Sequence, residues 1–174
     1  DGKIFLNAQP FSMAAPSFAD RLEGLVAAAG IPNARVVLEI TEQQTIQNPR
    51  ALASSLGRLR ERGFDLAIDD YREGNSNLHL ILELRPAYLK IARLFAQGLD
   101  RDERRKTLVT LTAEMASRLG MVTILEGVET PAECAQARAL GVDCAQGYHI
   151  ARPARAEDLA RTLQQIPAVE NVHP

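Results

Sequence analysis

The sequence predicts a parallel α/β fold, either a doubly wound sheet or a (β/α)₈ barrel. Two observations carry this prediction. Short apolar runs alternate with longer amphipathic stretches, and neighbouring runs lie roughly 20 to 35 residues apart, the pitch of strand–helix–strand units with parallel strands. There is also almost no turn signal for an antiparallel hairpin between the runs.

The predicted strands are short runs rich in apolar and β-branched residues, as buried strands are. They cover residues 4–6, 36–38, 66–68, 88–91, 122–125 and 144–148. The last run is the weakest, because it contains Gly147.

The predicted helices lie between these strands and are marked by amphipathic periodicity and by capping residues. They cover residues 18–29, 48–62, 75–84, 102–119, 130–140 and 156–165. Glycine, a common residue just beyond a helix C-terminus, follows several of them, at Gly30, Gly63, Gly120 and Gly141. Residues 167–174 are polar, so we predict one domain over residues 1–166 and a frayed tail over 167–174.

Composition narrows the class of protein further. The 174 residues are 46% apolar and 24% charged, as in a soluble globular domain, and the net charge of −2 disfavours electrostatic binding to nucleic acid. No apolar run is long enough to span a bilayer. Cys134 and Cys144 fit neither a zinc spacing nor a disulfide framework, so we expect reduced thiols and a cytoplasmic domain, with membrane anchoring left to any parent chain.

Polar residues of an unusual kind end each apolar run. In chain order they are Asn7, Glu39, Asp69 with Asp70, Lys90, Glu126 and Gln146. The carboxyl ends of parallel strands converge on one rim, so we expect these side chains to lie together. Clustered carboxylates repel one another unless a cation is bound, and oxygen ligands suit Mg²⁺, Mn²⁺ or Ca²⁺. Taken one at a time, the carboxylates could equally be surface groups or helix caps.

Two further residues near this rim, Lys90 and His149, can be explained with or without a bound ligand. Lys90 lies between Leu89 and Ile91 in a predicted strand, so it needs an anionic partner, either a carboxylate cluster or a ligand phosphate. His149 follows the last run, and we interpret it as a packed or exposed side chain and not as a metal ligand.

The motifs at these positions resemble those of the EAL domains, which hydrolyse the bacterial second messenger cyclic di-GMP. Phe5–Asn7 is similar to the family's VNLS strand, Leu38–Glu42 to ELTE, and Ala67–Tyr71 to the start of IDDFGTG. Tyr88–Ile91 is similar to YLKID, Glu126–Thr130 matches EGVET, and Gln146–Tyr148 with Pro153 matches the closing QGY and proline. Together these motifs are specific and span essentially the whole chain.

The resemblance implies a TIM-type (β/α) barrel with its site at the carboxyl-terminal rim. It implies one or two Mg²⁺ or Mn²⁺ ions, with ligands drawn from Asn7, Glu39, Asp69, Asp70 and Glu126. Lys90 would orient or activate the attacking water, and Glu126 and Gln146 would complete the catalytic set. Glu42 would steady the loop after Asp70, and Glu129 would lie behind the ligands or in a loop.

The sequence departs from the family pattern at several positions. Arg72 replaces a glycine and Glu73 a threonine in the loop after Asp70, which puts metal binding, substrate binding and dimerisation in doubt. Ala92 replaces the aspartate of KID, and Ala87 replaces an aspartate found in many members. The glutamate of the E-A-L tripeptide belongs on a strand upstream of Asn7.

Two functions follow from the resemblance. The first is a metal-dependent phosphodiesterase that hydrolyses cyclic di-GMP to linear pGpG, acting in a parent chain with sensor or GGDEF domains, as a homodimer. The second is a degenerate EAL module that binds cyclic di-GMP or a protein partner without turnover. A (β/α)₈ barrel typically needs about 250 residues, so six predicted strands in 174 residues suggest that the first strands lie upstream. We therefore expect these residues alone to be inactive or weakly active.

Overall fold

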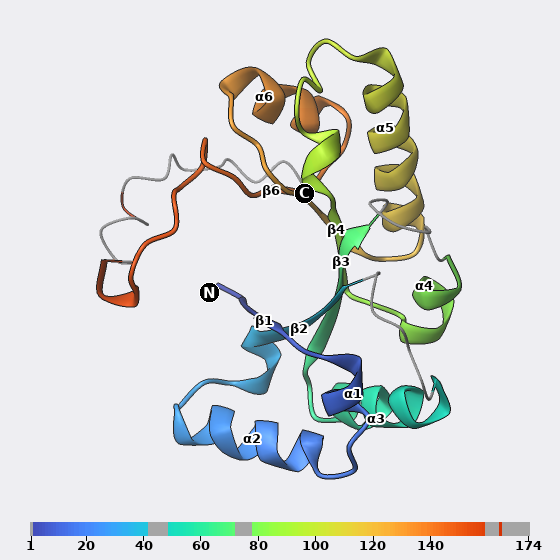
Figure 1. Ribbon diagram of the computed structural model, residues 1–174, viewed down its shortest axis with the longest axis vertical. Helices are drawn as coiled ribbons and strands as arrows, with labels where there is room; N and C mark the ends of the chain where they lie inside the picture. The colour runs from blue at the N-terminus through green and yellow to red at the C-terminus, as the bar shows by residue number, and fades with distance from the viewer. Residues whose placement is uncertain (1, 42–48, 72–77, 159–163, 165–174) are drawn as a thin grey trace.

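A computed structural model describes residues 2–41, 49–71, 78–158 and 164 of the chain. Its described part holds a parallel sheet in which the strands follow one another in chain order, β1-β2-β3-β4-β5-β6. Figure 1 shows this sheet with helices around it. The strands are β1 (Ile4–Asn7), β2 (Val36–Thr41), β3 (Asp65–Tyr71), β4 (Tyr88–Ile91), β5 (Val122–Leu125) and β6 (Cys144–Ala145).

The helices between the strands agree with the predicted pattern at most boundaries. They are α1 (Pro10–Met13), α2 (Phe18–Ala28), α3 (Pro49–Glu61), α4 (Leu78–Leu84), α5 (Glu103–Arg118) and α6 (Pro131–Ala139). Short 3₁₀ turns are η1 (Asn33–Arg35), η2 (Arg93–Phe95) and η3 (Ala156–Asp158). No helix of the described ranges is long and apolar enough to cross a membrane.

Strand order decides between the two predicted architectures. A doubly wound sheet reverses its strand order at a switch point, whereas here the order runs one way from β1 to β6. Because parallel crossovers are right-handed, a constant direction puts every connecting helix on the same face of the sheet. The sheet therefore forms part of a (β/α) barrel, and the TIM-type prediction is confirmed for the described strands.

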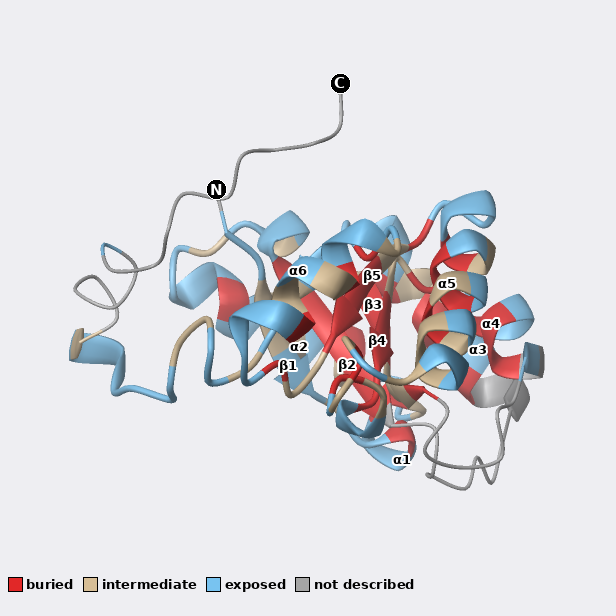
Figure 2. Ribbon diagram, turned by 90° about the horizontal axis from the view of Figure 1, so that it is seen from above, coloured by how far each residue is buried: buried red, intermediate tan, exposed pale blue. Residues whose placement is uncertain are grey.

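The apolar core lies between the strands and the helices that cover them. One cluster joins the outward side chains of β2 and β3, such as Leu38 and Ile68, to residues of α3 such as Leu56. A second cluster joins Ile91 and Leu125 to residues of α5 and α6. Figure 2 shows buried residues on the strands and on the helix sides that face them.

The opposite face of the sheet carries the alternate residues of each strand, because successive side chains point to opposite sides. The Phe5 and Tyr88 rings meet there edge to face, with centroids 5.2 Å apart. Lys3 Nζ lies 2.7 Å from Asp65 Oδ2 nearer the amino ends of the strands. The strand alternation therefore aims Glu39, Asp69 and Lys90 at this same face, at the carboxyl ends.

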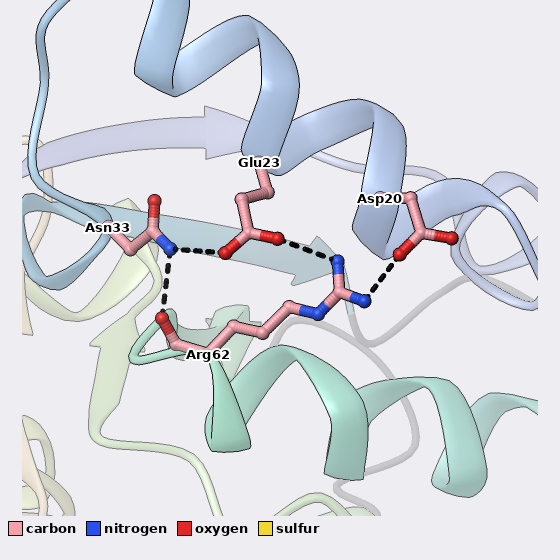
Figure 3. A network of polar contacts seen from close by, with 4 residues as sticks. All are labelled: Asp20, Glu23, Asn33 and Arg62. Carbon is pink, nitrogen blue, oxygen red and sulfur yellow. Dashed lines mark hydrogen bonds and ion pairs between the residues drawn. The ribbon is translucent and has the colours of Figure 1, made fainter.

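Surface ion pairs also fix α2 against α3. Arg62, just after α3, forms ion pairs with Asp20 and Glu23 of α2, the second with Nη1 and Oε2 3.0 Å apart (Figure 3). Asn33 Nδ2 donates to the Arg62 carbonyl oxygen at 2.9 Å and to Glu23 Oε1 at 3.3 Å. These contacts hold the outer layer that supports β2 and β3.

One predicted strand is shorter in the structure, and one predicted helix starts differently. The strand predicted over 144–148 ends at Ala145, because the chain then pairs with the loop after β5: the Val128 N–H donates to the Gln146 carbonyl and the His149 N–H to the Val128 carbonyl. The helix predicted over 156–165 begins as the 3₁₀ turn η3, and residues 159–163 lie outside the described part. The short helix α1 has no counterpart in the predicted pattern.

Candidate functional site

The centre of the site is the buried ammonium of Lys90 on β4. Its Nζ lies 2.7 Å from Glu39 Oε1, 2.8 Å from Asp69 Oδ1 and 2.8 Å from Glu126 Oε1. The partners come from β2, β3 and the residue after β5, so the ammonium joins groups from four neighbouring stretches of the sheet. The sequence left open whether the anionic partner of Lys90 is a carboxylate cluster or a phosphate, and the structure supplies the carboxylate cluster.

Electrostatics keep Lys90 charged. Burial alone would lower its pKa, but hydrogen bonds to Asp69, Glu126 and Glu39 outweigh this effect and raise the pKa above its ordinary value. A lysine in this state donates hydrogen bonds and does not accept a proton near neutral pH. Lys90 can therefore orient a water molecule or stabilise negative charge, and it cannot serve as a general base.

The surroundings of Glu126, unlike those of Lys90, favour the neutral form of the side chain. Burial raises the pKa of Glu126, and the nearby charges of Asp69 and Asp70 raise it further, although Lys90 pulls it down. The net direction is upward. Glu126 therefore takes up a proton at a higher pH than an ordinary carboxyl group.

Asp70 reaches the cluster through a local distortion of β3. Consecutive residues of a regular strand face opposite sides, so Asp69 and Asp70 would not share a site in an undistorted strand. Asp70 has a φ of 54°, and the pairing of β3 with β4 shifts register between Ile68 and Tyr71. Positive φ at a residue other than glycine is strained, and such strain concentrates at functional sites.

The donor set fits a hard divalent cation. Asp69, Asp70 and Glu126 each offer one carboxylate oxygen, and these atoms lie within 4.8 Å of one another. Glu39, Asp69 and Glu126 pair with the Lys90 ammonium, and Asp70 adds a fourth carboxylate beside Asp69 and Glu126. The cluster therefore carries an excess of negative charge, which Mg²⁺ or Mn²⁺ would neutralise through oxygen ligands.

The remaining predicted residues lie around this cluster. Asn7 ends β1, is exposed and is the register partner of Glu39. Gln146 is exposed beside the loop that follows β5, where its N–H donates to the Leu125 carbonyl at 2.8 Å. Glu129 is exposed and pairs with Arg93 at 3.1 Å. The last predicted residues, Glu42, Arg72 and Glu73, lie outside the described part of the chain.

The structure also places the two alanines that depart from the family pattern. Ala92 is fully buried after β4, so it adds no polar group to the rim. Ala87 precedes β4, and its N–H donates to the Leu66 carbonyl near the amino end of β3, which is the end opposite the carboxylate cluster. The Ala87 substitution therefore lies away from the candidate site.

Sequence reasoning missed two residues that organise the loop after β5. Glu133 accepts hydrogen bonds from three backbone N–H groups, and the Arg93 side chain covers Gly127. The pattern Thr130-x-x-Glu133 is that of a capping box and could have identified Glu133 as a helix cap. Contacts of Glu133 with a distant loop leave no local signal.

Comparison with known proteins decides the family. Residues 1–153 match the EAL domain family. The chain belongs to this family. The cyclic di-GMP phosphodiesterase RocR of Pseudomonas aeruginosa is 31% identical over 150 residues, which are 86% of this chain and 38% of RocR.

Solved EAL structures share the fold. The EAL domain of Mycobacterium smegmatis DcpA is 27% identical, with a TM-score of 0.89 over 96% of this chain and 75% of that chain. A manganese and cyclic di-GMP complex of Klebsiella pneumoniae BlrP1 is 27% identical, with a TM-score of 0.82 over 87% of this chain and 39% of that chain. This EAL chain thus spans less than two fifths of the length of RocR and of BlrP1.

Proposed function

We propose that this EAL domain takes part in the metal-dependent hydrolysis of cyclic di-GMP to linear pGpG. The observation that carries the proposal is the buried Lys90 held among Glu39, Asp69 and Glu126 at the carboxyl ends of adjacent parallel strands. The relatives support the substrate, since RocR is named a cyclic di-GMP phosphodiesterase and BlrP1 forms a complex with manganese and cyclic di-GMP.

The proposed metal site uses the oxygen donors at the strand ends. Asp69, Asp70 and Glu126 would hold Mg²⁺ or Mn²⁺, with Asn7 and Glu39 as further ligands from the neighbouring strands. When bound, the metal supplies Lewis-acid polarisation of a phosphodiester oxygen and lowers the pKa of a coordinated water.

The chain's own residues would then orient the water and the substrate and move the proton. Lys90, kept protonated by its carboxylate partners, donates hydrogen bonds from Nζ to the attacking water or to a phosphodiester oxygen. Glu126 would place one carboxylate oxygen on the metal and use the other to take the proton of that water. Gln146 is exposed, its N–H donates to the carbonyl of Leu125, the residue before Glu126, and its side chain offers an amide to orient water or substrate. Attack of the water oxygen on phosphorus breaks one P–O bond to ribose and opens the ring, and the released ribose oxygen takes up a proton, so that one water is added in all.

The test is direct hydrolysis by the full-length protein. Incubation with cyclic di-GMP and Mg²⁺ or Mn²⁺, followed by nucleotide chromatography, should give pGpG. Glu126→Gln should abolish most of this turnover, whereas Glu114→Gln, which alters an exposed carboxylate of α5, should retain it. If no pGpG forms with either metal, the proposed activity is wrong, and calorimetry with cyclic di-GMP then shows whether the domain binds the nucleotide without turnover.

Several predictions about the whole protein remain proposals. They are a domain boundary at residue 166, a homodimer, a cytoplasmic location and fusion to sensor or GGDEF domains. Residue 166 lies outside the described part of the chain. Size measurement and the sequence of the full-length protein test the dimer and the fusion separately.

A further inference from the structure

Glu133 on α6 is a buried carboxylate that the proposed chemistry does not use. Its residue exposure is 6%, and it accepts three backbone hydrogen bonds. Oε1 accepts from the Gly98 N–H at 2.9 Å, and Oε2 accepts from the N–H groups of Glu129 at 3.0 Å and Thr130 at 3.1 Å. Burial alone would raise the pKa of Glu133, but these N–H donors hold it below its ordinary value, so the carboxylate stays charged.

The three donors belong to two different loops of the rim. Gly98 lies in the segment that follows β4, the strand of Lys90. Glu129 and Thr130 end the loop that begins with Glu126, directly after β5. One carboxylate therefore joins the loop behind the central ammonium to the loop that carries a cluster carboxylate.

A plain helix cap would not need the contact with Gly98. The capping box of α6 is complete with Thr130 Oγ1 accepting from the Glu133 N–H and Glu133 Oε2 accepting from the Thr130 N–H. The second carboxylate oxygen is directed instead at a residue 35 positions earlier in the chain. This long-range hydrogen bond indicates that Glu133 does more than cap the start of α6.

A second contact joins the same two loops. Arg93 Nη2 lies 3.1 Å from Glu129 Oε1, and the Arg93 side chain passes so close to Gly127 that a Cβ there would be 2.2 Å from Arg93 Cγ. Glu133 thus fixes the end of the 126–130 loop from inside, and Arg93 covers it from the exposed side.

We propose that Glu133 is a positioning residue for the candidate active site: it ties the 126–130 loop to the segment after β4 and so holds Glu126 against Asp69 and Asp70. Groups behind the metal ligands orient them, and their replacement typically weakens metal binding about 10- to 100-fold. The identity of the reaction rests on the proposed function, whereas the effect of Glu133 on metal binding does not.

The test compares three variants of the full-length protein. Glu133→Ala removes both carboxylate oxygens. Thr130→Val removes the cap hydroxyl and is the matched control, because it leaves the bonds from Glu133 to Gly98 and Glu129 in place. Glu133→Gln keeps one acceptor oxygen, which can serve only one of the two loops.

Mn²⁺ affinity, measured by electron paramagnetic resonance at a temperature where every variant is folded, is the main readout. We expect Glu133→Ala to bind Mn²⁺ about 10-fold more weakly, as replacement of groups behind metal ligands does. Glu133→Gln should lie between Glu133→Ala and the wild type, and Thr130→Val should match the wild type although it melts at a lower temperature. In the metal-free protein, amide hydrogen exchange at Gly98 should be faster in Glu133→Ala and unchanged in Thr130→Val.

The outcomes separate this proposal from the proposed function. If Glu133→Ala and Thr130→Val lose stability alike and neither changes Mn²⁺ affinity, Glu133 is only a helix cap and the proposal is overturned. If the wild type binds Mn²⁺ without cleaving cyclic di-GMP and Glu133→Ala still weakens Mn²⁺ binding, the positioning role holds and the phosphodiesterase assignment fails. A wild type that binds no Mn²⁺ overturns both.

Discussion

Lys90 Nζ lies 2.7 Å from Glu39 Oε1, and each of these side chains is only 7% exposed. Because Asp69 and Glu126 lie at the same ammonium, Lys90 acts as a built-in cation at the centre of a carboxylate cluster. Removal of one partner from a buried ion pair costs about 3 to 5 kcal/mol, since it leaves an uncompensated charge. Lys90 therefore has a structural role in the metal-free protein as well as a proposed catalytic one.

The first prediction concerns Lys90→Ala. This variant should lose most turnover and keep metal binding, and its metal-free form should unfold at lower urea concentration than the wild type. Added Mn²⁺ should recover more stability in Lys90→Ala than in the wild type, because a divalent cation can replace the missing ammonium among the carboxylates. Urea unfolding followed by circular dichroism, with and without Mn²⁺, measures both effects.

The control for this prediction is Lys106→Ala. Lys106 Nζ lies 2.7 Å from Glu103 Oε1 on the exposed surface of α5, so the two ion pairs have the same length and differ in burial. An exposed pair contributes about 0.2 to 1 kcal/mol to stability. The stability lost in Lys106→Ala should therefore be small and the same with and without Mn²⁺. Full turnover in Lys90→Ala, or an equal Mn²⁺ effect in both variants, would contradict the role given to Lys90.

The second prediction concerns the pH dependence at Glu126. A carboxyl group whose pKa is raised on folding stabilises the fold below its unfolded pKa, and that contribution is lost as the pH rises through the folded-state pKa. The stability of the metal-free wild type relative to Glu126→Gln should therefore fall with rising pH over this window. Urea unfolding of both proteins at a series of pH values measures this difference in the free energy of unfolding. If the difference rose with pH instead, the pKa of Glu126 would be lowered by folding.

The sequence predicted the rim and the positions of the strands well, because both follow from local signals, whereas it left the order of the strands in the sheet open. Each apolar run ends in a polar residue such as Glu39 or Lys90, and parallel strands bring such ends together whatever the details of packing. The glycines after the helices likewise mark boundaries by backbone conformation, as the φ of 67° at Gly30 shows.

Other features depend on tertiary contacts and left no such signal. The φ of 54° at Asp70 arises where β3 shifts register against β4, and the sequence of β3 alone reads as a regular strand. The early end of β6 follows from pairing of Gln146 and His149 with Val128, which lies in another loop. The bond from Gly98 to Glu133 also joins residues that are distant in the sequence.

The third prediction concerns the surface network around Arg62 (Figure 3). Arg62→Ala removes the ion pairs to Asp20 and Glu23, and since these partners are exposed we expect a loss of about 1 kcal/mol in the free energy of unfolding. The loss should shrink in 1 M salt, because salt screens exposed charges. Mn²⁺ affinity should not change, and a change there would show that the α2–α3 layer is coupled to the rim.

The fourth prediction compares glycines with the same backbone conformation and different surroundings. Gly127 has a φ of 70° and Gly120 a φ of 72°, so alanine should cost each about 1 to 2 kcal/mol through the backbone. An added Cβ at Gly120 meets nothing within 4 Å, whereas at Gly127 it would lie 2.2 Å from Arg93 Cγ. Gly127→Ala should therefore displace Arg93, break its pair with Glu129 and weaken Mn²⁺ binding, and Gly120→Ala should reduce stability alone.

The double variant Arg93→Ala/Gly127→Ala identifies the cause of this difference. Shortening Arg93 removes the Cγ and Cδ atoms that an added Cβ would meet at 2.2 and 2.9 Å, although Arg93 Cβ remains at 2.8 Å. The double variant should then be less destabilised than the sum of its single variants, as measured by a double-mutant cycle in urea. Additive losses would mean that Gly127 is required for its backbone conformation only and that Arg93 does not hold the loop that carries Glu126.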